Sequence, residues 1–257
     1  MRIGILGTGA IGGEIARAVS SWPEITAIAL FDQDAARAKK VAAACGPKAT
    51  IVGDGLALIE RCDLLIETAT QEAAKQWAPR ALEAGRDVLL LSIGAFVDDA
   101  FKANVERLAR AHRRKVYLPS GAICGIDLIR AASLAELKSV TLVTTKPPAG
   151  LGVDVDKWTV IFDGPAREAV QKFPKNVNVA MCLSLAGLGP DATKVQVVAD
   201  PLTTRNQHKV IVEGAFGRAR IEVENLPSPD NPKTSYLASL SAIATLRRIL
   251  DPIQVGA

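Results

Sequence analysis

The feature that most constrains the fold is a glycine-rich turn near the beginning of the chain. A short apolar run at residues 2–6 is followed directly by Gly7, Gly9 and Gly12, which have the spacing G-x-G-x-x-G. Ile15 and Val19 then recur at helical spacing. This order of strand, tight turn and helix is typical of the first βα unit of a doubly wound α/β sheet, where the amino end of the helix stabilises a bound phosphate.

An acidic residue indicates that a dinucleotide is the ligand of this turn. Residues 25–31 are predicted to form a second strand, which ends in Asp32, twenty residues beyond Gly12. A carboxylate at this place binds the adenosine ribose hydroxyls of NAD and disfavours the additional phosphate of NADP. We therefore predict NAD as the cofactor. No arginine follows Asp32 before Arg37, so the use of NADP is possible but less favoured. The predicted contacts are Gly7, Gly9, Ala10, Ile11, Gly12 and Asp32. The alternative is a packing turn without a ligand.

Strands and helices continue to alternate as far as residue 118. Short apolar runs at residues 50–52, 64–67, 88–91 and 116–118 are separated by helical patterns. This alternation predicts a parallel sheet with helices on both faces, as in a Rossmann fold. From Pro119 onward, longer strands of alternating polarity and hairpin signals predict a second, α+β domain built on an open, largely antiparallel sheet.

We assign three segments along the chain. Residues 1–118 are predicted to bind the dinucleotide, and residues 119–230 to bind the substrate, carry the catalytic residue and form a dimer. Residues 231–257 are predicted to form a C-terminal helix that packs back on the first domain. An exposed face of an open sheet favours self-association, which makes a homodimer the expected assembly.

Composition excludes several classes of partner. The net charge of +4 and the aromatic content of 4% are too low for a nucleic-acid surface built from basic stripes and stacked rings. No stretch approaches the roughly 18 consecutive apolar residues that a membrane-spanning helix needs. The 4 cysteines lie far apart without a metal-binding spacing, so we expect free thiols in a reducing cytoplasm and no metal site.

Small residues follow several of the predicted parallel strands. Thr68 and Ala69 come after the strand at residues 64–67, and Ser120 comes after the strand at residues 116–118. The carboxyl ends of parallel strands border the crevice in which a nicotinamide would lie. Thr68 and Ala69 are therefore predicted cofactor contacts and Ser120 a substrate contact, with ordinary turn chemistry as the alternative. Asn178 similarly either caps a helix or hydrogen-bonds the carboxamide of the cofactor.

The search for a general base is short because the chain has 2 histidines. His112 belongs to a basic run that ends a predicted helix, which is a surface position. His208 enters a predicted strand in which Val210 and Val212 share its face. A histidine here is either a hydrogen-bonded core residue or a catalytic base tuned near neutral pH. The presence of a dinucleotide domain with no other histidine candidate favours the base.

Several longer motifs give the chain a resemblance to a known family, and the resemblance extends over nearly the whole sequence. Besides the glycine turn, the motifs are the segments 119–125, 144–148, 173–180 and 231–235, and Asp200-Pro201 together with Asn206 and His208. In these segments the chain resembles the L-aspartate dehydrogenases. Many dehydrogenases share the glycine turn, whereas the other motifs are long and unusual enough to be specific.

The resemblance implies an enzyme that oxidises L-aspartate with NAD or NADP to iminoaspartate, which hydrolyses to oxaloacetate and ammonia or enters NAD biosynthesis. It also implies His208 as the catalytic residue, Ala122 and Asn178 as cofactor contacts, and a dimer. The chemistry is compatible with this role, because hydride leaves only from a neutral amine. A base such as His208 would remove an ammonium proton and later activate water on the imine.

A dicarboxylic amino acid as substrate requires cationic anchors. The motifs offer Lys146, Lys175 and Lys233, each of which is alternatively a surface lysine. Two other functions stay open at this point. One is a related two-domain dehydrogenase that acts on another amino acid or imine, of the homoserine or dihydrodipicolinate type. The other is a dinucleotide sensor without turnover.

Overall fold

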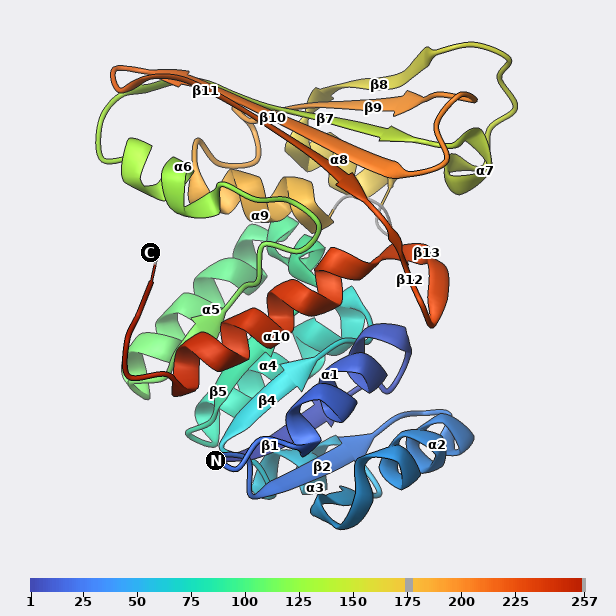
Figure 1. Cartoon of the computed structure of the whole chain (residues 1–257). Helices are drawn as coiled ribbons and strands as arrows, with labels where there is room; N and C mark the ends of the chain where they lie inside the picture. Colours follow the sequence, from blue (N-terminus) through green and yellow to red (C-terminus); the bar gives the residue numbers. More distant parts are fainter. Residues whose placement is uncertain (174–177, 256–257) are drawn as a thin grey trace. The chain divides into compact units, whose positions relative to one another are not determined.

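The computed structural model describes residues 1–173 and 178–255, which divide into two compact units (Figure 1). Unit 1 comprises Met1–Pro119 and Ser239–Pro252, whereas unit 2 comprises Ser120–Ala238 and the end of the chain from Ile253. Each unit has its own β-sheet. Among the described residues, none of the helices is both long enough and apolar enough to cross a membrane.

Unit 1 contains a parallel sheet of six strands in the order β3-β2-β1-β4-β5-β6. The strands are β1 (Arg2–Leu6), β2 (Ala27–Phe31), β3 (Ala49–Ile51), β4 (Leu64–Glu67), β5 (Asp87–Leu90) and β6 (Val116–Tyr117). The helices between them are α1 (Ala10–Ser20), α2 (Ala35–Cys45), η1 (Gly46–Lys48), α3 (Gly55–Glu60), α4 (Gln71–Glu83), η2 (Ile93–Val97) and α5 (Asp99–Ala111). This strand order with helical crossovers is that of the Rossmann fold, which confirms the predicted fold class.

The core of unit 1 explains why its strands are apolar throughout. Ile3 and Ile5 of β1 and Leu30 of β2 are fully buried in a cluster that includes side chains of α1 and α2. Strands that are covered on both faces need apolar residues at nearly every position rather than an alternating pattern. The last helix, α10 (Tyr236–Leu250), adds Ala242 and Leu246 to the same cluster.

Unit 2 is built on a sheet of five strands in the order β11-β10-β7-β9-β8. The strands are β7 (Leu137–Lys146), β8 (Thr159–Pro165), β9 (Lys194–Ala199), β10 (Asn206–Gly214) and β11 (Gly217–Asn225). Strands β7 and β9 run parallel, and the other neighbouring pairs are antiparallel, as expected for the second domain. The other elements are α6 (Ile126–Ala132), α7 (Pro148–Leu151), α8 (Ala166–Lys172), α9 (Asn178–Ala186) and the paired short strands β12 (Pro227–Ser228) and β13 (Asn231–Ser235).

Helices α6, α8 and α9 lie along one face of this second sheet (Figure 1). Leu142 of β7 and Val210 and Val212 of β10 are buried on that face, whereas Val143 and Ile211 on the other face are partly exposed. The alternation is that of an antiparallel sheet with one covered face. Towards the end of β7 and the start of β10, the buried face changes from apolar to polar, and the candidate site of unit 2 begins there.

Candidate active site

The glycine turn of unit 1 has the geometry that a dinucleotide-binding turn needs. Gly7 has a φ of +92°, which strains any residue with a side chain. A Cβ on Gly12 would fall on the carbonyl oxygen of Gly7 and would lie 2.6 Å from Thr68 Oγ1, so glycine is required where α1 meets the turn. Gly9 differs, because nothing lies within 4 Å of an added Cβ there. Its backbone therefore borders open space that a phosphate can approach.

The carboxylate of Asp32 is held against this turn. Its Oδ2 accepts hydrogen bonds from the backbone N–H of Thr8 at 2.6 Å and from the Thr8 hydroxyl at 2.9 Å, and its Oδ1 accepts from the Asp34 N–H at 2.9 Å. Burial alone would raise the pKa of Asp32, but these hydrogen bonds and the charge of Arg37 outweigh burial, so the pKa is lowered. Asp32 is thus ionised and fixed at the carboxyl end of β2, beside Thr8.

A buried carboxyl group that no sequence motif indicates lies at the end of β4. Glu67 is fully buried, and its Oε1 accepts from the Ala69 N–H at 2.7 Å and from the Ser92 hydroxyl at 2.8 Å. Its Oε2 accepts from the Ser92 N–H at 3.1 Å. Thr68 Oγ1 in turn donates to the Gly7 carbonyl at 2.6 Å. Glu67 therefore ties the loops that follow β4 and β5 together, and Thr68 ties them to the glycine turn.

The burial of Glu67 predicts a pH-dependent stability. Burial raises the pKa of Glu67 to about 7 from 4.5, although the hydrogen bonds from Ser92, Ala69 and Thr70 act to lower it. The contribution of this group to stability is therefore fully present below pH 4.5 and is lost as pH rises towards 7. The difference between these two pKa values corresponds to about 3 kcal/mol of unfolding free energy. We therefore expect the wild type to lose about 3 kcal/mol of unfolding free energy relative to Glu67→Gln as the pH rises from 4.5 to about 7.

Urea denaturation at a series of pH values measures this difference. Glu72→Gln is the matched control, because Glu72 is an exposed glutamate in the first turn of α4 whose pKa is lowered rather than raised. If the stability curves of the wild type and Glu67→Gln run parallel from pH 4.5 to 7.5, the carboxyl group of Glu67 does not titrate in the folded protein as stated.

The candidate site of unit 2 is a set of polar residues on the buried face of the second sheet. His208 of β10 pairs with Thr144 of β7 and with Val223 of β11, so its side chain shares a face with both. Lys146 lies two residues beyond Thr144 on the same face of β7. Asn206, two residues before His208, pairs with Asn225 at the end of β11. Strand pairing therefore places residues from three strands side by side at this end of the sheet.

His208 is held as a neutral ring. It is 4% exposed, and its Nδ1 is 3.1 Å from Thr144 Oγ1, which leaves Nε2 as the other polar atom of the ring. Burial, with a smaller contribution from the charge of Lys146, lowers the pKa of His208 to about 3. The sequence favours a base tuned near neutral pH, but the pKa of His208 in the free protein is much lower, because the ring has lost its water and faces a cation.

Lys146 is a second ionisable group on this face. It is 6% exposed, and burial lowers the pKa of Lys146 to about 8 from 10.5. A buried cation at the end of a sheet is a suitable partner for a carboxylate of a ligand. Of the other predicted anchors, Lys175 lies outside the described residues, as does the side chain of Lys233 in β13.

The remaining predicted contacts of unit 2 lie in one loop and one helix. Ser120 is half-buried, and Ala122 in the same loop is buried, with its carbonyl accepting a hydrogen bond from Asn225 Nδ2 at 3.1 Å. Asn178 is the first residue of α9 and is half-buried. The hydrogen bond from Asn225 ties the Ala122 loop to the polar end of the sheet. The predicted roles of these residues in binding stay predictions.

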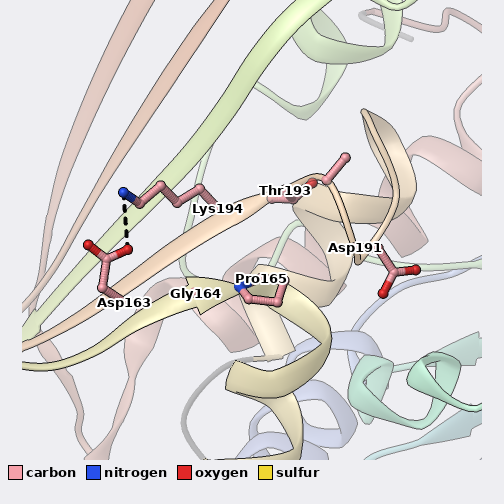
Figure 2. Close-up of a pocket in the computed structure, with 7 residues that line it drawn as sticks. Asp163, Gly164, Pro165, Asp191, Thr193 and Lys194 are labelled. Carbon is pink, nitrogen blue, oxygen red and sulfur yellow. Dashed lines mark ion pairs between the residues drawn. The ribbon is translucent and has the colours of Figure 1, made fainter.

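A separate hollow of about 380 Å³ lies elsewhere in unit 2, at the end of β8 (Figure 2). It is lined by Asp163, Gly164, Pro165, Asp191, Ala192, Thr193 and Lys194. Its carboxylates have partners, because Asp163 pairs with Lys194 at 3.1 Å and Asp191 with Arg167 at 2.6 Å. None of the predicted site residues lines this hollow. Within residues 1–173 and 178–255, no three His, Cys, Asp or Glu side chains are grouped to hold a metal ion.

The strand order, glycine turn and acidic residue after β2 define unit 1 as the pyridine-nucleotide-binding domain of an oxidoreductase. The family model "Homoserine dehydrogenase, NAD binding domain" matches residues 7–119. The solved structure of GenD2 from gentamicin A biosynthesis in complex with NAD has the same fold, with a TM-score of 0.60 and 13% sequence identity, covering 100% of this chain and 88% of that one.

The comparisons over the whole chain are more specific. The family model "Aspartate dehydrogenase, C-terminal" matches residues 127–249. The L-aspartate dehydrogenase of Methanosarcina acetivorans is 48% identical to this chain, and the match covers 100% of this chain and 99% of that protein. The L-aspartate dehydrogenase of Methanothermobacter thermautotrophicus is 38% identical, and the match covers 100% of this chain and 98% of that protein. The crystal structure of aspartate dehydrogenase from Thermotoga maritima has a TM-score of 0.80 at 27% identity, covering 100% of this chain and 99% of that one. The chain belongs to the L-aspartate dehydrogenase family.

Proposed function

We propose that the protein oxidises L-aspartate with NAD to iminoaspartate, and that water then converts the imine to oxaloacetate and ammonia. The observation that carries this proposal is the polar end of the second sheet, where a buried histidine and a buried lysine share one face. The glycine turn fits the cofactor, because Gly9 borders open space and Gly12 leaves no room for a side chain. NAD, when bound, accepts a hydride from the α-carbon of the amino acid.

The residues of unit 2 have complementary roles in this proposal. His208 removes a proton from the ammonium group of the substrate, because hydride departs only from the neutral amine. Thr144 holds Nδ1 of the ring, which directs Nε2 at the substrate. Lys146 pairs with a substrate carboxylate. The negative charges of a bound dicarboxylate raise the proton affinity of the imidazole from its low value in the free protein, so substrate binding itself activates the base.

We further propose that the enzyme works in the cytoplasm as a homodimer and supplies NAD biosynthesis. Its partner in this proposal is a small dicarboxylic amino acid, and it binds neither nucleic acid nor membranes. Support for the dimer comes from the second sheet. Its helices lie along one face (Figure 1), and the other face presents Val143, Lys209 and Ile211, which are partly exposed. An uncovered sheet face of this kind is a common surface for a twofold contact.

Steady-state kinetics test the proposed activity and cofactor together. We expect L-aspartate to drive the reduction of NAD, followed at the NADH absorbance, with NADP used roughly tenfold less efficiently because its extra phosphate meets the Asp32 carboxylate. Asp32→Ser should shift the preference towards NADP. D-Aspartate and L-homoserine serve as control substrates. Reduction of NAD with L-homoserine but not with L-aspartate would instead support a related dehydrogenase, and NADH binding without any turnover would support a sensor.

A further inference from the structure

Asn225 lies next to His208 on the polar end of the second sheet and has an unusual hydrogen-bonding environment. It is 3% exposed and is the last residue of β11, opposite Asn206. Its Nδ2 donates to the carbonyl of Ala122 at 3.1 Å and to the carbonyl of Asn206 at 3.4 Å. Because both neighbours are carbonyl oxygens that can only accept, the orientation of the amide is determined, and Oδ1 points away from them.

The Oδ1 atom of Asn225 is buried, and no described residue donates a hydrogen bond to it. A buried acceptor without a donor is costly and therefore uncommon in folded proteins. An amide that keeps its acceptor unpaired beside a candidate active site is thus well placed to receive an N–H group of a ligand.

The position of Asn225 on the sheet indicates which N–H group this is. Asn225 is the diagonal neighbour of His208, because Asn225 pairs with Asn206 and His208 pairs with Val223. The backbones of diagonal neighbours on one face of an antiparallel pair are about 7–8 Å apart, with their side chains on the same side. At this spacing two long polar side chains can both reach one nitrogen atom of a ligand. The amino group that His208 deprotonates is such an atom.

We propose that Asn225 Oδ1 accepts a hydrogen bond from the amino group of the substrate and positions it against the His208 ring. This inference rests on the proposed function. A neutral amide suits the reaction better than a carboxylate here, because it binds the ammonium ion and the neutral amine alike. A carboxylate would favour the ammonium form and oppose the loss of the proton. The ligand group is therefore a primary amine next to a carboxylate, and Asn225 distinguishes an amino acid from the matching diacid without an amine.

The test measures binding in the absence of turnover, with the full chain saturated with NADH. Calorimetry gives the Kd of L-aspartate and of succinate, which has both carboxylates but no amine. For Asn225→Ala we expect the Kd of L-aspartate to rise about tenfold, whereas the Kd of succinate and of NADH stays within about twofold. In Asn225→Asp one carboxyl oxygen faces the Ala122 and Asn206 carbonyls and keeps a proton to donate to them, whereas the other oxygen still accepts. We therefore expect this variant to bind L-aspartate within about threefold of the wild type.

Other results would overturn the proposal in identifiable ways. Equal losses for succinate and L-aspartate would show that Asn225 acts only by holding the Ala122 loop. A loss confined to NADH would show that Oδ1 instead receives the carboxamide of the cofactor. If Asn225→Ala does not fold, the binding data of Asn225→Asp distinguish the two roles. A purely structural role of Asn225 predicts that Asn225→Asp binds both L-aspartate and succinate more weakly than the wild type. Wild-type turnover with L-aspartate is measured separately, so a failure of the proposed function is distinguished from a failure of the role of Asn225.

Discussion

Replacing His208 by alanine lowers kcat for L-aspartate oxidation by a factor of about 10²–10⁴, which is the usual contribution of a positioned general base. The Kd of NADH stays within about twofold of the wild type, because His208 belongs to unit 2, whereas the glycine turn and Asp32 belong to unit 1. Stopped-flow or steady-state assays give kcat, and fluorescence titration gives the Kd of NADH. Thermal denaturation of the variant shows that the loss of activity is not a loss of fold.

The chain provides a matched control for this experiment. His112, the other histidine, is exposed and follows α5 as its C-cap residue, so His112→Ala should leave kcat unchanged. The pH profile adds an independent readout. Because burial and Lys146 lower the pKa of His208 to about 3, the kcat/KM profile of the free enzyme shows no ionisation of this ring between pH 5 and 7. A kcat for His208→Ala within threefold of the wild type would contradict the assigned role.

The parts of the molecule that local chemistry controls could be predicted from the sequence. The glycine turn, the acid after β2 and the alternation of strands and helices follow from spacing alone, and the family models and relatives agree with that fold. The inward direction of His208 also follows from alternation, because Val210 and Val212 on the same strand face are buried.

Elements that depend on tertiary packing were harder to predict. Pro79 predicts a break in the helix around residues 72–84, yet α4 runs through it, because Ala78, Ala81 and Leu82 pack into the core and outweigh one lost hydrogen bond. Leucine spacing in the last helix predicts that Leu240 is buried, but it is 40% exposed, and Ala242 and Leu246 fill the core instead. Small residues allow close packing that a hydrophobic pattern does not indicate.

The missed site residues share a physical cause. A single acidic residue that ends the apolar strand β4 has no spacing that distinguishes it, so the hydrogen bonds of Glu67 to the loop after β5 emerge only from strand order. Asn225 is next to His208 because β11 pairs with β10 in one particular register. The low pKa of His208 depends on burial and on Lys146 of β7, a strand about sixty residues earlier in the chain. Register and burial are properties of the folded sheet, and local spacing does not encode them.

The glycine turn leads to the second large effect, which falls on cofactor binding. Gly12→Ala places a methyl group on the Gly7 carbonyl and against Thr68 Oγ1, so the turn must shift. Such overpacking costs about 1–3 kcal/mol of folding stability. The shift also moves the N–H groups at the start of α1 that would receive the pyrophosphate, and we expect the Kd of NADH to rise by about 100-fold or more.

Two other glycines separate these effects. Gly9→Ala adds a methyl group with nothing within 4 Å, so it loses less stability than Gly12→Ala, and the loss comes only from the poorer capping by alanine at this N-cap position. The methyl group nevertheless occupies the space that the pyrophosphate approaches, and NADH binding weakens. Gly53→Ala has the same free space outside the turn and should change neither quantity. Urea denaturation and fluorescence titration of the three variants give both quantities. Wild-type affinity for NADH in both Gly9→Ala and Gly12→Ala would mean that the nucleotide binds elsewhere, because a ligand at this turn cannot tolerate both a blocked approach and a displaced helix start.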